Sequence, residues 1–116
     1  MSVENAVKKL DEAFNSQDLN AVLSFYEDDA VLVARPGQLI RGKENLRKFF
    51  IDVFASELKA RQEKTHVIEN GDIALFLSRW TLSGQQFVAT SVFKRSKNGM
   101  WRLSIDNSFG PAVLEQ

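Results

Sequence analysis

Two adjacent polar residues near the carboxyl end of the chain could do chemistry. Asp106 and Asn107 follow the alternating apolar residues Trp101, Leu103 and Ile105. A carboxylate that is moved from water into an apolar pocket acquires a raised pKa and can act as a general base. An amide cannot act as a base at neutral pH, but it can orient a carbonyl or carboxylate group of a ligand.

The direction of these two side chains depends on the phase of the strand that carries them. Strict alternation over residues 100–109 places Asn107 on the face of Trp101, where it lines a pocket or caps the strand end. Asp106 then lies on the other face, solvated or paired with Arg102. A β-bulge near residue 106 would reverse both directions, and bulges are frequent next to binding sites. The sequence leaves both phases open.

His66 is the single histidine and the second candidate for a general acid or base. The alternative is a partly exposed strand residue without a chemical role. One histidine and no cysteine cannot form a His-rich or thiolate metal site. The chain has no glycine-rich nucleotide motif and no serine-histidine-aspartate order. We therefore expect neither a metal nor a cofactor.

Hydrophobic periodicity predicts the elements that position these residues. Apolar residues at spacings of three and four predict helices over 2–16 and 19–26, and a third helix after Gly42. A short strand is predicted over 30–34, followed by a Pro-Gly turn. Long strands are predicted over 60–69, 72–82, 86–95 and 100–109.

Two dipeptides, Asn70-Gly71 and Asn98-Gly99, are typical of type I′ hairpin turns. With these turns, Trp101 and Leu103 share a face with Thr90. Residues 1–116 are predicted to form a single α+β domain, with helices on one face of an antiparallel sheet.

Hairpin pairing predicts a sheet that is apolar on both faces. His66, Ile68 and Leu75 share one face of the first hairpin, and Phe76 and Trp80 lie on the other. An antiparallel sheet usually leaves one face in water, so this sheet needs two covers. The helices supply one cover. We predict that a second copy supplies the other, in a homodimer that packs through the sheet.

Composition excludes several classes of partner. The 116 residues include 15 basic and 15 acidic side chains, and this zero net charge does not favour nucleic acid. No apolar segment approaches the roughly 18 residues that would span a membrane. The amino-terminal residues show no signal-peptide pattern, so we expect a cytoplasmic protein.

The order of motifs along nearly the whole chain resembles the SnoaL-like and ketosteroid-isomerase-like superfamily. The segments that carry the resemblance are DLNAVLSFYEDDAVLVARPGQLIRGKENLRKFF, NGDIALF and FKRSKNGMWRLSIDNS. The Gly-x-Trp-Arg-Leu run at Gly99–Leu103 is similar to the last strand of that family. The resemblance implies a cystatin-like cone, in which a curved antiparallel sheet wraps around three amino-terminal helices. It also implies a pocket at the open end of the cone and frequent dimers.

The resemblance further implies which side chains surround the pocket. Aromatic residues near the cone interior serve both as core and as pocket wall. The expected ligand is a small hydrophobic or carboxylate-bearing molecule. The expected ligand-binding residues are Tyr26, Phe50, Phe54, Trp80, Thr90 and Asn107.

Steroid isomerases of this superfamily combine an Asp base with a Tyr and a protonated Asp. The sequence departs from that scheme. Phe14 stands where a Tyr would be wanted, the only Tyr is Tyr26, and no buried-looking Asp lies in strands 60–69 or 86–95. We therefore do not expect ketosteroid isomerase activity.

Two functional hypotheses follow. The first is a small-molecule binding protein with an apolar pocket and one or two polar anchors. The second is a cofactor-independent isomerase, cyclase or lyase. In this second hypothesis Asp106 or His66 acts as the base, and Tyr26 or Asn107 donates a hydrogen bond. The two hypotheses differ in whether a titratable group lines the pocket.

Overall fold

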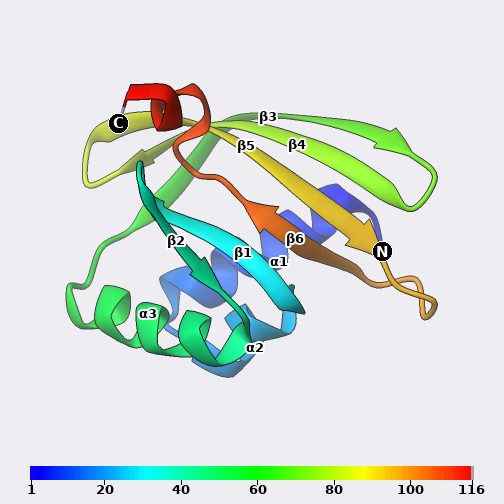
Figure 1. The fold of residues 1–116 in the computed structure, drawn as a ribbon, viewed down its shortest axis with the longest axis horizontal. Coiled ribbons are helices and arrows are strands. Elements are labelled where there is room, and N and C mark those ends of the chain that lie inside the picture. The colour runs from blue at the N-terminus through cyan, green and yellow to red at the C-terminus, as the bar shows by residue number, and fades with distance from the viewer. Residues whose placement is uncertain (116) are drawn as a thin grey trace.

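Three helices cover one face of a curved sheet in the computed structural model, which describes residues 1–115 (Figure 1). The first two helices begin at side-chain caps. The Ser2 hydroxyl accepts a hydrogen bond from the Asn5 amide, and the Asp18 carboxylate accepts one from the Ala21 amide. The helices are α1 (Val3–Asn15), α2 (Leu19–Ser24) and α3 (Lys43–Ala55).

The sheet has six strands in the order β2-β1-β6-β5-β4-β3. Neighbouring strands are antiparallel except β1 and β6, which pair in parallel. A short 3-10 helix, η1 (Gly110–Glu115), follows the last strand. This arrangement confirms the predicted α+β cone. The strands are β1 (Tyr26–Arg35), β2 (Gln38–Arg41), β3 (Ala60–Asn70), β4 (Ile73–Leu82), β5 (Gln85–Arg95) and β6 (Trp101–Asp106).

The start of β1 differs from the sequence prediction. The helix predicted to reach residue 26 ends at Ser24, and Tyr26 is the first residue of the strand. Tertiary pairing decides this boundary, because the Leu103 amide donates to the Phe25 carbonyl at 2.7 Å and Tyr26 pairs with Leu103. The short strand β2 after the Pro-Gly turn was not predicted.

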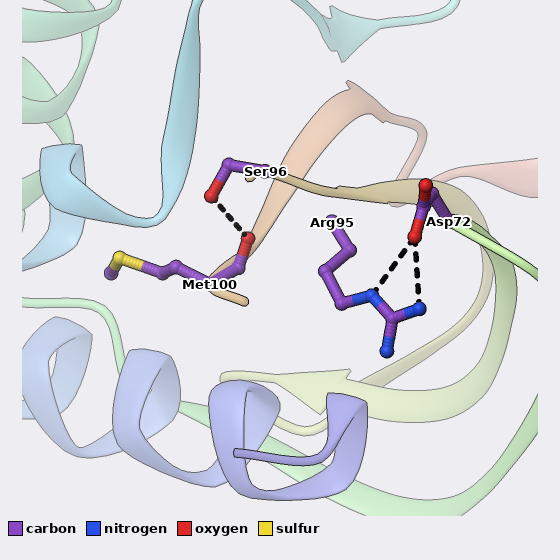
Figure 2. A network of polar contacts seen from close by, with 4 residues as sticks. All are labelled: Asp72, Arg95, Ser96 and Met100. Carbon is purple, nitrogen blue, oxygen red and sulfur yellow. Dashed lines mark hydrogen bonds and ion pairs between the residues drawn. The ribbon is translucent and has the colours of Figure 1, made fainter. Parts of the chain in front are cut away.

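The pairing register of the first hairpin is shifted by two residues from the predicted one. Asn70 pairs with Ile73, so the loop is Gly71-Asp72. Asp72 accepts two hydrogen bonds from the Arg95 guanidinium, the shorter at 2.9 Å (Figure 2). An even shift preserves the faces of both strands, so Ile68 and its new partner Leu75 still share a face.

The second hairpin closes with a five-residue loop, and this changes the strand faces. The Ser96 hydroxyl donates to the Met100 carbonyl at 3.1 Å inside this loop (Figure 2). Because the loop is odd in length, Leu103 pairs with Phe93 and faces the core, and Trp101 is buried with it. The prediction that these residues share a face with Thr90 is therefore wrong.

Two β-bulges then reverse the side-chain phase, one in the edge strand β3 and one in the inner strand β6. Glu63 is an extra residue in β3, between the pairs of Gln62 and Lys64. Ser104 is an extra residue in β6, between the pairs of Leu103 and Ile105. Each bulge turns a polar neighbour toward the helices, Gln62 in β3 and Asp106 in β6.

The two faces of the sheet have different surroundings. The inner face packs on the helices around Phe93, Leu103 and Leu46, which are at most 3% exposed. The outer face carries large apolar side chains that are 39–51% exposed in the described chain: Ile68, Ile73, Leu75, Val88 and Ile105. Within residues 1–115, no helix has the length and apolar character needed to cross a membrane.

Candidate functional site

A cavity of about 320 Å³ lies between the helices and the inner face of the sheet. This volume is at the lower end of the range of roughly 300–1,000 Å³ that is usual for small-molecule sites. All three helices contribute to its wall, together with every strand except β2. The wall is mainly apolar and aromatic, with side chains that include Val7, Leu10, Phe14, Leu32, Phe49, Phe50, Phe76, Trp80 and Phe93.

Asp106 contributes a carboxyl group to this wall. The bulge at Ser104 directs Asp106 inward, where the Tyr26 hydroxyl donates to its Oδ2 at 2.5 Å. The hydroxyls of Ser91 and Ser108 donate to Oδ1 at 3.2 and 3.4 Å. One carboxyl group thus accepts hydrogen bonds from β1, β5 and the segment after β6.

Burial dominates the electrostatics of this pair. It raises the pKa of Asp106 above the ordinary value of 3.8, although the hydrogen bonds from Tyr26, Ser91 and Ser108 oppose the rise. Burial raises the pKa of Tyr26 well above 10, and the neighbouring Asp106 charge adds to the effect. Tyr26 therefore remains a hydroxyl donor throughout the physiological pH range.

Asp11 brings a second carboxyl group to the same cavity from α1. Gln62 donates to Asp11 Oδ1 at 3.4 Å, and the buried Ser78 hydroxyl donates to Gln62 Oε1. Burial raises the pKa of Asp11 from 3.8 to about 6, and the negative charge of Asp106 contributes to this rise. The hydrogen bond from Gln62, which the bulge at Glu63 turns inward, lowers the pKa of Asp11 and so opposes this rise.

Of these three groups, Asp11 can exchange a proton near neutral pH. A carboxyl group with a pKa close to the working pH can take and return a proton efficiently. The Tyr26 hydroxyl gives its one proton to Asp106, so it can donate to an oxygen atom of a bound molecule only after it turns away from that carboxyl group. Residues 1–115 contain no cluster of three or more His, Cys, Asp or Glu side chains that could hold a metal ion.

A family model described as a SnoaL-like domain matches residues 7–103. The chain belongs to the SnoaL-like family. The match extends from α1 into β6 and so includes the elements that carry Asp11, Tyr26 and Gln62. A search of curated proteins by sequence finds no match.

Solved structures share the fold of this SnoaL-like domain. An NTF2-like protein of unknown function from Pseudomonas putida is 18% identical, with a TM-score of 0.78 over 94% of this chain and 84% of that chain. A cystatin-like protein of unknown function from Nostoc punctiforme is 16% identical, with a TM-score of 0.75 over 90% and 84%. A ketosteroid isomerase-like protein from Erwinia carotovora is 25% identical, with a TM-score of 0.66 over 90% and 89%.

Four of the residues singled out from the sequence line the SnoaL-like cavity: Tyr26, Phe50, Trp80 and Asp106. Phe54 lies outside the lining and packs on Phe14, with ring centroids 5.6 Å apart. His66 is exposed on β3 and pairs with Leu77, so it lies away from the cavity.

Asn107 also lies outside the cavity lining, because its amide is used within the turn after β6. Its Oδ1 accepts from the amides of Phe109 and Gly110. Its Nδ2 donates to the Thr90 hydroxyl and to the Gly110 carbonyl, so Thr90 is engaged here as well. Of the two alternatives for Asn107, the structure shows the amide that caps the strand end.

Asp11 and Gln62 are site residues that the sequence reasoning missed. Asp11 follows Val3 and Val7 at intervals of four residues along the buried side of α1. That spacing was the available signal. No comparable signal marks Gln62. Tyr26 and Asp106, which the sequence offers as a hydrogen-bond donor and a base, form a hydrogen-bonded pair.

The raised pKa of Asp11 predicts a specific pH dependence of stability. The folded state binds this proton more tightly than the unfolded state, so stability falls as pH rises from about 4 to about 6. We expect Asp11→Asn to remove this loss. The difference in the free energy of unfolding between the variant and wild type should be about 2 kcal/mol more favourable to the variant at pH 7 than at pH 4. Urea unfolding at the two pH values measures the difference.

Glu12→Gln is the matched control, since Glu12 is exposed on the same helix. It should leave the pH dependence unchanged. Equal behaviour of the Asp11 and Glu12 variants would mean that the Asp11 carboxyl is solvated.

Proposed function

We propose that the protein binds one small, largely apolar organic molecule in the cavity. The observation that carries this proposal is an apolar wall around a cavity of about 320 Å³ that also holds a small set of polar groups. Sites for small molecules commonly combine such a wall with a few convergent polar side chains. Here Tyr26, Asp106 and Asp11 supply the polar anchors.

A cavity-filling substitution tests the binding proposal. Ala89 is buried in the cavity wall, whereas the adjacent Val88 is 45% exposed on the outer face. Ala89→Leu should weaken the binding of 2-naphthol, a neutral bicyclic probe, by at least about tenfold, because it fills space that the probe needs. Val88→Leu should bind like wild type. Trp80 lines the cavity, so its fluorescence reports occupancy. Failure of wild type to bind, or equal binding by both variants, would reject the proposal.

A second candidate function is favoured by the position of Asp106 in the cavity wall. In this function the site catalyses cofactor-independent proton transfer, as an isomerase, cyclase or lyase. The carboxylate of Asp106 would remove a proton from a carbon next to a carbonyl group. Once Asp106 is protonated, the Tyr26 hydroxyl would turn from it and donate its hydrogen bond to the enolate oxygen. The carboxylic acid would then return the proton to the product.

Hydrogen–deuterium exchange tests this chemistry. The protein should accelerate exchange of the α-protons of 2-tetralone in deuterated buffer, followed by NMR. Asp106→Asn should slow the catalysed exchange by about 10²–10⁴-fold, the usual contribution of a general base. His66→Gln should leave it unchanged, since His66 is exposed on the outer face. Binding of 2-tetralone without exchange above the buffer rate would reject the proton-transfer function and retain only the binding function.

We also propose that two copies pair through the outer face of the sheet. Exposed Ile68, Ile73 and Val88 lie on that face, and covering them would remove apolar surface from water. Light scattering at micromolar concentration should give the mass of two chains. Ile73→Lys should reduce it to one. A single-chain mass for wild type would contradict this arrangement.

A further inference from the structure

The charged side chains in the cavity wall are all acidic within the described residues 1–115. Asp11 comes from α1 and Asp106 from β6, and Tyr26 from β1 is the other titratable group in the lining. The remaining elements around the cavity contribute neutral side chains, such as Val22 from α2 and Gln62 from β3. The interior of the site is therefore negative whenever either carboxyl group is ionised.

A negative apolar interior requires a compensating positive charge. An ionised carboxylate in a low-dielectric site is costly unless it is paired or protonated. In the unliganded protein the hydrogen bonds to Asp106 and Asp11 only partly offset burial. Below about pH 6 a proton fills this role at Asp11. Above that pH a bound cation could take its place.

Both carboxyl groups retain capacity to accept hydrogen bonds from such a cation. A carboxylate offers about four lone-pair sites. Asp106 uses three of them for Tyr26, Ser91 and Ser108, and Asp11 uses one for Gln62. An ammonium group has three donors and could contact a carboxylate while it sits in this cavity.

The rest of the wall favours an organic cation over a metal ion. Eight of the lining side chains are aromatic, among them Phe50, Phe76 and Trp80. The faces of aromatic rings attract ammonium groups and also pack against an apolar body. A bare divalent metal requires several oxygen or nitrogen ligands, and residues 1–115 provide no cluster of that kind.

We infer that the ligand of this cavity is a small apolar molecule that carries a protonated amine. This inference rests on the proposed binding function and names its ligand class. The ammonium group contacts Asp106 or Asp11, and the apolar body lies against the aromatic wall. A carboxylate-bearing ligand, one of the two classes expected from the sequence, would be repelled by both side chains.

Three probes with one naphthalene skeleton test the charge preference: 2-naphthylmethylamine, 2-naphthalenemethanol and 2-naphthoate. At pH 7 the amine should bind wild-type protein at least tenfold more tightly than the alcohol, and the carboxylate should bind most weakly. Asp106→Asn and Asp11→Asn should each reduce the preference for the amine at least threefold while the alcohol binds as before. Glu12→Gln is the control on α1 and should retain the full preference.

The pH dependence of wild-type binding provides a second arm that needs no variant. The amine stays protonated between pH 5 and pH 7, whereas Asp11, with a pKa of about 6, loses its proton over this interval. Amine affinity should therefore rise at least threefold from pH 5 to pH 7, and alcohol affinity should not rise.

The outcomes separate the two proposals. Alcohol binding that equals or exceeds amine binding, with no rise in amine affinity with pH, overturns the cation inference and leaves the binding function intact. Failure of wild type to bind 2-naphthol rejects the binding function itself, and the cation inference falls with it.

Discussion

The hydrogen bond between the Tyr26 hydroxyl and the Asp106 carboxyl is the interaction on which the candidate site depends. It joins β1 and β6, the one parallel pair in the sheet, across the wall of an apolar cavity. A carboxyl group in such a place is costly unless donors surround it. Tyr26, Ser91 and Ser108 supply those donors from three parts of the chain. Held in this position, Asp106 gives the cavity wall one of its two carboxyl groups.

Two one-residue insertions in the strands make that arrangement possible. Without the bulge at Ser104, alternation would turn Asp106 to the outer face beside exposed apolar residues. Without the bulge at Glu63, Gln62 would not reach Asp11. A bulge bends its strand and increases the local twist, so the same features that curve the sheet also deliver its polar groups to the cavity.

Much of the fold could be predicted because its signals are local and repeated. The helical stripe of α3 and the glycine-containing hairpin turns mark their elements directly in the sequence. The apolar outer face was also evident from the first hairpin, because a shift of two residues leaves faces unchanged. The end of α2 was missed, since pairing with β6 overrides helical propensity at Tyr26.

The site was harder to predict because one inserted residue reverses every side chain beyond it. The choice between Asp106 and Asn107 depended on a bulge that no residue type at Ser104 announces. The sequence also did not indicate that the second hairpin loop has five residues, the length that places Leu103 opposite Phe93. Helical spacing alone could have placed Asp11 on the buried side of α1, but a charged side chain near an apolar stripe is usually solvated.

The central claim is that Asp106 and Asp11 share one desolvated cavity, and an NMR titration of the aspartate carboxyl carbons tests it most directly. We expect Asp11 to titrate near pH 6 and Asp106 above its ordinary value of 3.8. In Asp106→Asn the midpoint of Asp11 should fall, because a neighbouring negative charge has been removed. Midpoints near 4 for both residues, unaffected by each other's substitution, would show that the two carboxyl groups are solvated and separate.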